Sequence, residues 1–156
     1  MKLTEILSPE RILVDSDGGF VRGKVDALRL LSHMLAPAIE VEQHLIERQL
    51  TERERLQSTG IGDGVAIPHT SVEAAPHQAA ALLLCPQGVP FEAIDGNSVN
   101  IIFGVVGPKR ATGEHLRTLA RISRLLRDSS TRDKLVQAPG PEEAFKLIEA
   151  HDAALR

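Results

Sequence analysis

The chain has 156 residues, of which 42% are hydrophobic and 25% charged, and its formal net charge is −3 from 18 basic and 21 acidic residues. These values are typical of one globular domain; they exclude a disordered or fibrous chain and give no overall attraction to nucleic acid. With four Phe, no Tyr and no Trp, the chain has few side chains that could stack on single-stranded nucleic acid. We therefore predict one domain over residues 1–156 that does not bind nucleic acid.

The single cysteine and the lengths of the apolar runs indicate the cellular compartment of the protein. The single Cys85 permits no internal disulfide and no cysteine-rich zinc site, which favours a reducing compartment. Acidic Glu5 stands where a signal peptide would need an apolar core. The longest apolar runs, 79–85 and 101–107, are far shorter than the about 20 residues that a membrane span needs. We expect a cytoplasmic protein without membrane insertion.

Taken in chain order, the first 40 residues predict a turn, a strand and a helix. Residues 11–14 read as a brief strand that leads into a polar turn over 15–19. Apolar residues at helical spacing predict a helix over 24–36, and Pro37 is expected to end it.

A second helix is predicted over residues 41–56, with charged residues dominating its later turns. Thr51 begins a capping-box pattern that normally marks the start of a helix. This helix therefore has a potential break at Leu50.

The middle third of the chain changes character. Short apolar runs over 65–67, 79–84 and 99–106 are bounded by Gly, Pro and Asn, which is typical of buried strands. A turn is predicted at 95–97. The last third is helical again, over 113–127, 131–137 and 142–151. Helices on both sides of a group of strands predict an α/β (α+β) class with one sheet covered by helices.

The segment 58–69, STGIGDGVAIPH, carries the most specific chemical signal. Its alternate glycines permit close backbone approach or positive φ, but Val65 stands where a dinucleotide fingerprint needs its third Gly. No Gly-Lys-Ser/Thr follows, so a phosphate-binding P-loop is also excluded. His69 comes directly after a short strand and Pro68, and such a rigid histidine suits a nucleophile or a general base. The alternative is a histidine on a surface turn.

His115 is the second candidate. At about 100° per residue it lies on one stripe of its predicted helix with the apolar positions Leu119, Ile122 and Leu126. It also lies in the first turn, where unpaired N–H groups and the helix dipole favour an anion, and Thr112 or Gly113 is expected to cap that end. A histidine there could hydrogen-bond a phosphate; the alternative is a core histidine satisfied by a carbonyl.

The remaining candidates point to no metal chemistry. His33, His44, His77 and His151 form no HExxH, HxH or Cys/His pair, so no zinc site and no other cofactor is predicted. Cys85 ends an apolar strand and is expected to be inert core. Residues 109–132 contain seven basic residues against two acidic ones, which predicts a solvated face, or alternatively a docking surface for an acidic partner. On the predicted third helix Arg117, Arg121 and Arg124 form a basic stripe opposite the apolar one.

Four blocks of the sequence carry a family resemblance. They are STGIG followed by GVAIPH (58–69), FEAIDG (91–96), VNIIF (99–103), and EHL followed by LA (114–120). In this order and spacing they resemble the enzyme IIA domains of the fructose, mannitol and nitrogen-regulatory class (type 2) of the bacterial phosphotransferase system. The likeness runs from about residue 1 to 150 and implies a sandwich with a single mixed β-sheet between helices.

The resemblance also implies the site and its partners. His69 would accept a phosphoryl group from the phosphocarrier HPr as a tele-phosphohistidine, His115 matches the family's second active-site histidine, and Arg53 matches its arginine. Thr59 matches a threonine before the glycines. A guanidinium and a helix N-terminus would offset phosphoryl charge in transfer without metal or nucleotide. Where the family usually has Gly after the phosphoacceptor, this chain has Thr70.

Several functions stay open at this stage. The preferred one is a nitrogen-related regulatory IIA, whose phosphorylation state sets which target proteins it binds. Alternatives are a fructose- or mannitol-type transport IIA that passes phosphate to a cysteine of enzyme IIB, and a non-catalytic binding module in which His69 is vestigial. A histidine-based hydrolase is disfavoured, because no Ser or Cys nucleophile lies in a recognisable elbow.

Overall fold

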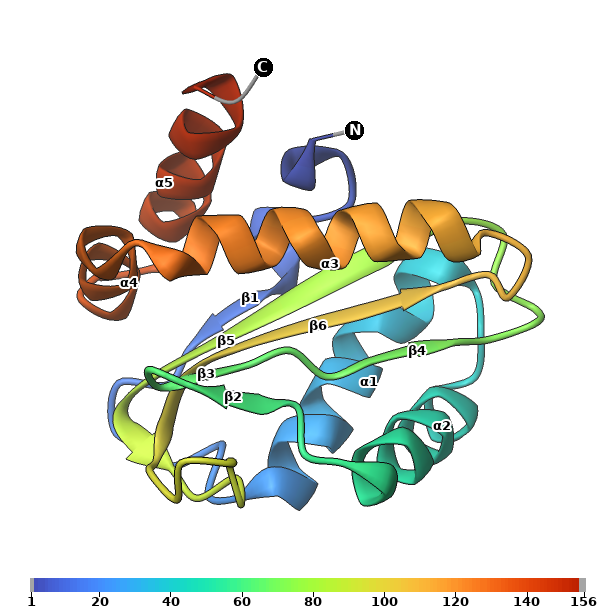
Figure 1. The fold of residues 1–156 in the computed structure, drawn as a ribbon, viewed down its shortest axis with the longest axis horizontal. Helices are drawn as coiled ribbons and strands as arrows, with labels where there is room; N and C mark the ends of the chain where they lie inside the picture. Colours follow the sequence, from blue (N-terminus) through green and yellow to red (C-terminus); the bar gives the residue numbers. More distant parts are fainter. Residues whose placement is uncertain (1, 155–156) are drawn as a thin grey trace.

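The computed structural model describes residues 2–154, so residues 1 and 155–156 of the predicted domain lie outside the described part. A six-stranded sheet lies at the centre with helices on both faces (Figure 1). Its strands are β1 (Ile12–Val14), β2 (Gly60–Gly62), β3 (Val65–Ala66), β4 (His69–Ser71), β5 (Ala79–Val89) and β6 (Val99–Gly107). The helices are α1 (Lys24–Ile39), α2 (Gln43–Leu56), α3 (Thr112–Arg127), α4 (Ser129–Val136) and α5 (Pro141–Ala154), preceded by the 3₁₀ turns Leu3–Glu5 and Pro9–Arg11.

The sheet is mixed, as the resemblance implied. Its strand order is β1-β5-β6-β3-β2, and β4 pairs with β6 beyond the end of β3. The pairs β1–β5, β3–β6 and β4–β6 are parallel, whereas β5–β6 and β2–β3 are antiparallel. The predicted class, a single mixed sheet flanked by helices, is therefore confirmed.

The central strand β5 is apolar along most of its length because both of its faces are covered. Ala81 and Leu83 belong to the core under α1 and α2, whereas Leu82 and Leu84 belong to the core under α3, α4 and α5. This alternation is the period of two that a strand imposes on its side chains. Each face of the sheet thus has its own hydrophobic core.

Two helix predictions were wrong in detail. The first helix continues through Pro37 to Ile39 and ends at Glu40, whose left-handed conformation lets its N–H donate to the carbonyl of Ala36. Pro37 lies in the last turns of the helix, where its missing N–H removes one backbone hydrogen bond. Burial of the Ile39 side chain in the core stabilises the helical conformation beyond Pro37. The second helix is unbroken from Gln43 to Leu56, because the Thr51 hydroxyl donates to the carbonyl of Glu47 inside the helix instead of capping a new one.

The strands differ from the prediction in two ways. β2 and β4 were not predicted, because three residues are too few to show an alternating pattern. β5 continues five residues beyond its predicted end at residue 84, after a register shift against β6. The third helix begins with Ala111 as its N-cap, so Thr112 lies inside the first turn and the predicted cap at Thr112 or Gly113 was wrong. The Thr112 hydroxyl donates to the carbonyl of Lys109.

A buried carboxylate fixes α3, which carries His115. Asp152 of α5 accepts hydrogen bonds from the backbone N–H groups of Leu3 (3.2 Å) and Thr4 (2.9 Å). The same Oδ1 lies 3.5 Å from Nε of Arg121 on α3, and the Asp152 side chain is 2% exposed. The N-terminal turn, α3 and α5 therefore share one charged anchor.

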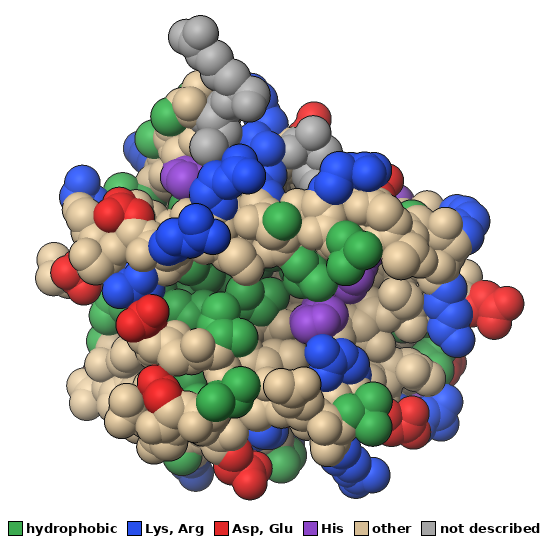
Figure 2. Space-filling view, in the orientation of Figure 1, with side chains coloured by type: hydrophobic (Ala, Val, Ile, Leu, Met, Phe, Trp, Pro, Cys, Tyr) green, Lys and Arg blue, Asp and Glu red, His purple; other side chains and the backbone are tan. Residues whose placement is uncertain are grey.

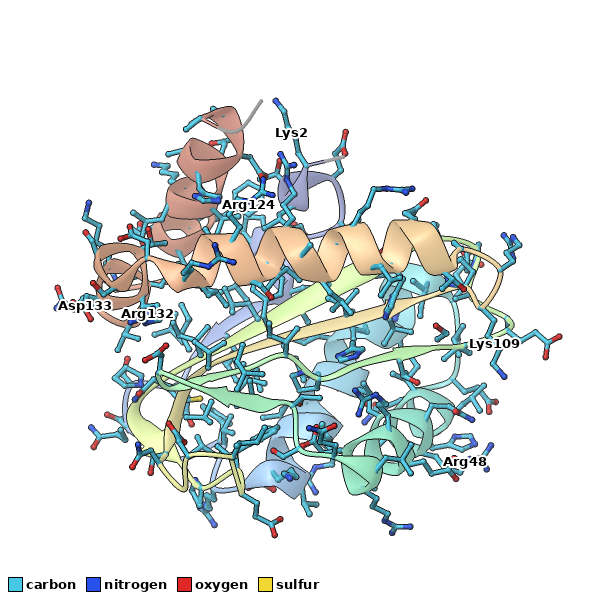
Figure 3. All side chains as sticks on the ribbon, in the orientation of Figure 1. Lys2, Arg48, Lys109, Arg124, Arg132 and Asp133 are labelled. Atoms are coloured by element: carbon cyan, nitrogen blue, oxygen red, sulfur yellow. The ribbon has the colours of Figure 1, made fainter. Side chains whose placement is uncertain are left out.

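We expect Asp152→Ala to lower the free energy of unfolding by about 3–5 kcal/mol, because it leaves the Arg121 guanidinium and two backbone donors without their partner. Urea denaturation measures the change. Asp133→Ala on α4 is the matched control, since Asp133 is exposed (Figure 3) and should change stability by less than about 0.5 kcal/mol. Equal effects of the two substitutions would contradict the anchoring role.

Candidate active site

His69 begins β4, directly after Pro68, and its side chain is partly buried. Its Nδ1 lies 2.7 Å from the carbonyl oxygen of Ile67. Because a carbonyl can only accept, Nδ1 carries the proton and donates it. In the neutral ring the unprotonated nitrogen, which carries the lone pair, is therefore Nε2.

The backbone on both sides of His69 is held by the sheet. β3 pairs with β6 at Ile101 and Ile102, and β4 pairs with the same strand from Val105 onward. The peptide between them is also tied, because the N–H of Val105 donates to the carbonyl of Pro68 (3.0 Å). β3 and β4 therefore pair with successive stretches of β6, and His69 lies at the start of the second of these two strands.

His115 lies in the first turn of α3, 9% exposed, as its place on the apolar stripe predicted. Its ring centroid is 5.7 Å from that of His69, with the planes tilted by 48°. Histidine side chains come to the surface at the centre of the face drawn in Figure 2, below α3 and next to a basic side chain. The strand-end histidine and the helix-start histidine, distant in sequence, form one pair.

Arg53 of α2 reaches the same pair. Its Nη2 lies 3.4 Å from Nε2 of His69, and its Nη1 lies 3.4 Å from the carbonyl oxygen of Gln57. The structure therefore brings His69, His115 and Arg53 together from β4, α3 and α2.

Thr59, the fourth predicted residue, faces another partner. Its hydroxyl donates to Glu54 Oε1 (2.5 Å) and its N–H donates to Glu54 Oε2 (2.9 Å). Its carbonyl accepts from the N–H of Ile67 (3.0 Å), the residue whose own carbonyl holds His69. Thr59 is thus linked to His69 through the backbone, and its hydroxyl is bonded to Glu54.

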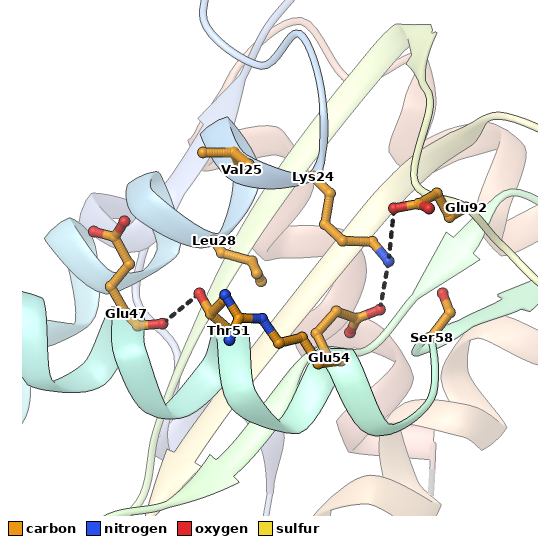
Figure 4. Close-up of a pocket in the computed structure, with 9 residues that line it drawn as sticks. Lys24, Val25, Leu28, Glu47, Thr51, Glu54, Ser58 and Glu92 are labelled. Carbon is orange, nitrogen blue, oxygen red and sulfur yellow. Dashed lines mark hydrogen bonds and ion pairs between the residues drawn. The ribbon is translucent and has the colours of Figure 1, made fainter.

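Glu54 is the residue that the sequence analysis missed. It is 5% exposed and its Oε2 lies 3.1 Å from Nζ of Lys24 on α1. Lys24 also lies 5.0 Å from the centroid of the Phe91 ring. Figure 4 shows this ion pair at the wall of a pocket of about 570 Å³ between α1 and α2. Glu54 follows Arg53 in the sequence but lies about 100° further round the helix, toward Lys24. One carboxylate within a run of charged residues carries no signal of burial.

The electrostatics of the pair favour neutral rings. Burial lowers the pKa of His69 below its ordinary value, and the Arg53 guanidinium lowers it further, while the Ile67 hydrogen bond and the Glu54 carboxylate act in the opposite direction. Burial also lowers the pKa of His115, and His69 adds to the effect. Both rings are therefore mostly unprotonated at neutral pH.

This arrangement can hold and transfer an anion. It offers a nucleophilic Nε2 on His69, a guanidinium within reach of that atom, a second imidazole, and the N-terminal turn of α3. Positive charge around a nucleophile is what transfer of a phosphoryl group requires of a protein. Within residues 2–154 no group of three His, Cys, Asp or Glu side chains is placed to hold a metal ion.

Other predicted features lie apart from this site. Burial raises the pKa of the Cys85 thiol to about 12, so Cys85 is inert core, as predicted. In the basic stripe Arg117 and Arg124 are exposed to solvent, whereas Arg121 forms an ion pair with the buried Asp152. Only part of the stripe is therefore a solvated face. At the end of α3, Arg132 (Figure 3) donates to the carbonyls of Leu126 and Arg127. Among residues 2–154, every helix is too short or too polar to span a bilayer.

A family model, related sequences and a solved structure all match this chain to one protein family. The family model for the phosphoenolpyruvate-dependent sugar phosphotransferase system, EIIA 2, matches residues 5–151. A nitrogen regulatory protein of Pseudomonas aeruginosa is 34% identical over 95% of both chains. A mannitol-specific phosphotransferase enzyme IIA component of Staphylococcus aureus is 30% identical over 97% of this chain and 100% of its own. The crystal structure of nitrogen regulatory protein IIA-Ntr from Neisseria meningitidis superposes with a TM-score of 0.84 at 30% identity, covering 92% of this chain and 97% of that one.

We expect the two rings to make stability depend on pH. Their folded pKa values lie below the unfolded value of about 6.5, so the unfolded chain binds more protons, and the free energy of unfolding falls as the pH drops below about 6.5. Urea denaturation at about pH 7.5 and about pH 5.5 measures this loss. The double variant His69→Gln/His115→Gln should show a smaller loss; an unchanged one would contradict the shifts.

Glu54→Ala should lower the free energy of unfolding by about 2–4 kcal/mol, since it leaves two donors of Thr59 without their partner and Lys24 with only the longer ion pair to Glu92 (3.7 Å). Glu52→Ala, on an exposed position of the same helix, is the control in the same denaturation experiment. Adding Lys24→Met to Glu54→Ala should recover part of the loss. If Glu54→Ala matches Glu52→Ala, the buried carboxylate is not an anchor.

Proposed function

Since this chain belongs to the EIIA 2 family of the phosphoenolpyruvate-dependent sugar phosphotransferase system, we propose that His69 is its phosphoryl acceptor and that the chain is a regulatory phosphocarrier. Members of this family are phosphotransfer components. The observation that carries the assignment to His69 is its bond to the Ile67 carbonyl, which leaves Nε2 unprotonated beside Arg53.

The proposed transfer is a displacement between two imidazoles. The Nε2 lone pair of His69 attacks the phosphorus of a phosphohistidine on an HPr-type donor, and the donor's N–P bond breaks as the new one forms. The electron pair of the broken bond returns to the donor imidazole, while Nδ1 of His69 keeps its proton on the Ile67 carbonyl. Because one N–P bond replaces another, no nucleotide and no metal is required, and His69 becomes a tele-phosphohistidine.

The neighbouring groups would stabilise the charge that moves. The Arg53 guanidinium, 3.4 Å from Nε2, is placed to hydrogen-bond the equatorial phosphoryl oxygens. His115, with its ring centroid 5.7 Å from that of His69, is placed to donate to another oxygen from the first turn of α3. Lowered pKa values keep both rings neutral before transfer, so the nucleophile is not protonated.

The relatives favour a regulatory role over sugar transport. The Pseudomonas aeruginosa protein is named as nitrogen regulatory and covers nearly the whole chain, and the Neisseria meningitidis structure carries the same description. In such a role the phosphorylation state of His69 would set which target proteins bind, in the cytoplasm. The second candidate is a transport component that passes phosphate to a cysteine of enzyme IIB, and the mannitol-specific relative supports it.

Intact mass spectrometry under alkaline conditions tests the carrier role. Incubated with enzyme I, HPr and phosphoenolpyruvate, the protein should gain one phosphoryl group, and His69→Ala should gain none. Arg53→Met should slow the gain by about 10²–10³-fold, because it removes a charged donor from the transfer. Arg48→Met, on the exposed face of the same helix (Figure 3), should leave the rate unchanged.

A gain that survives His69→Ala would refute the assignment, and no gain in the unsubstituted protein would favour a binding module without phosphotransfer. Incubation of the phosphorylated protein with an enzyme IIB domain separates the two candidates. Loss of the phosphoryl group to a IIB cysteine supports transport, and retention supports regulation.

A further inference from the structure

A second polar cluster lies behind His115, on the side of Gly107. Gln78, 3% exposed, immediately precedes β5, and its Nε2 donates to Oε1 of Glu114 in the first turn of α3 (2.5 Å). The backbone around Gln78 is held as well, because Nη2 of Arg110 donates to the carbonyl of Pro76 (3.4 Å). The Gln78 amide is therefore held by Glu114, and the backbone just before Gln78 is held by Arg110.

Two buried atoms of this cluster lack hydrogen bonds to any described residue. They are Oε1 of Gln78 and Nδ1 of His115. Both side chains border Gly107, where an added Cβ would lie 2.8 Å from Cγ of Gln78 and 3.7 Å from Nδ1 of His115. The absent side chain at position 107 thus leaves the space in which the two residues meet.

The chemistry of the two atoms is complementary. The Glu114 carboxylate only accepts, so it fixes the Gln78 amide with the NH₂ group toward itself and leaves Oε1 as an acceptor facing elsewhere. Nδ1 of an imidazole can donate, and burial makes an unpaired donor and an unpaired acceptor costly together. No hydrogen bond joins the two atoms in this structure, and since Glu114 holds the amide, a turn of the His115 ring is the movement that would pair them.

We propose that Gln78 is a positioning residue which holds the proton of His115 on Nδ1, in a chain Glu114–Gln78–His115. Nε2 of His115 is then the nitrogen left for the phosphoryl group; this last step rests on the proposed function. Both rings of the pair would carry their proton on Nδ1, His69 against the Ile67 carbonyl and His115 against the Gln78 amide.

The arrangement explains how a buried ring could receive a dianion. When the phosphoryl group sits on His69, its charge favours addition of a proton from solvent to Nε2 of His115. That Nε2–H donates to a phosphoryl oxygen, and Nδ1–H keeps its partner in Gln78 Oε1. The imidazolium then has both donors paired, and Gln78 acts through His115 without touching the phosphoryl group.

The tautomer of His115 tests the proposal without any phosphate. Two-bond ¹⁵N–¹H correlation spectra distinguish protonated from unprotonated ring nitrogens, and His115→Gln assigns the signals. The unsubstituted protein should show His115 with the proton on Nδ1. Gln78→Met, which keeps the length but removes the acceptor, should move His115 toward the Nε2–H form and leave the His69 signals unchanged.

Gln87→Met, at an exposed glutamine of β5, is the matched control and should leave the His115 signals unchanged. Glu114→Ala, at an exposed position, should give a partial shift because the Gln78 amide becomes free to turn. Onward phosphoryl transfer should slow by roughly fivefold in Gln78→Met, the factor that one ordinary hydrogen bond represents.

An Nε2–H tautomer in the unsubstituted protein, or identical spectra for Gln78→Met and Gln87→Met, would overturn the proposal. If Gln78→Met does not fold, Glu114→Ala alone decides, since an unshifted His115 tautomer there also contradicts it. Should the protein take no phosphoryl group at all, the proposed function fails while the tautomer measurements still stand.

Discussion

The hydrogen bond from Nδ1 of His69 to the Ile67 carbonyl is the constraint on which the rest of the site depends. It selects the ring nitrogen that is free to react and fixes the direction in which that nitrogen points. It also requires Ile67 to be held in place, and the carbonyl of Thr59 does this by accepting the Ile67 N–H. Thr59 in turn is held by the buried Glu54, so the His69 ring is oriented by a chain of contacts that begins at α1 and α2.

The helix α2 keeps opposite charges apart. Arg53 faces the histidine pair, and the next residue, Glu54, faces Lys24 and the pocket between the helices. Within the described part of the chain Arg53 forms no ion pair with a carboxylate, so its charge remains available to an incoming anion. A helical spacing of about 100° between neighbours is enough to place two opposite charges on two different surfaces.

Features that depend on neighbouring residues could be predicted from the sequence, whereas features that depend on tertiary contacts could not. The strand-end position of His69 and the apolar stripe of His115 follow from short-range patterns, and Arg53 came only from the family resemblance. Nothing local indicates that Glu54 is buried or that Gln78 lies beside Gly107, because both depend on which strands and helices meet. Pro37 and Thr51 misled the helix boundaries for the same reason: buried Ile39 and Leu50 outweigh local signals that would otherwise end a helix.

The split between β3 and β4 has a consequence for how copies of the chain behave in a crowded solution. Exposed sheet edges invite pairing with a second molecule, and proteins discourage this with short strands, prolines and charged groups. Here β3 is covered by β2, and only the three-residue β4, which begins with His69 directly after Pro68, pairs with β6 alone; Arg53 lies beside it. His69 can thus stand at an open edge, where the proposed phosphoryl transfer needs it, without offering a template for aggregation.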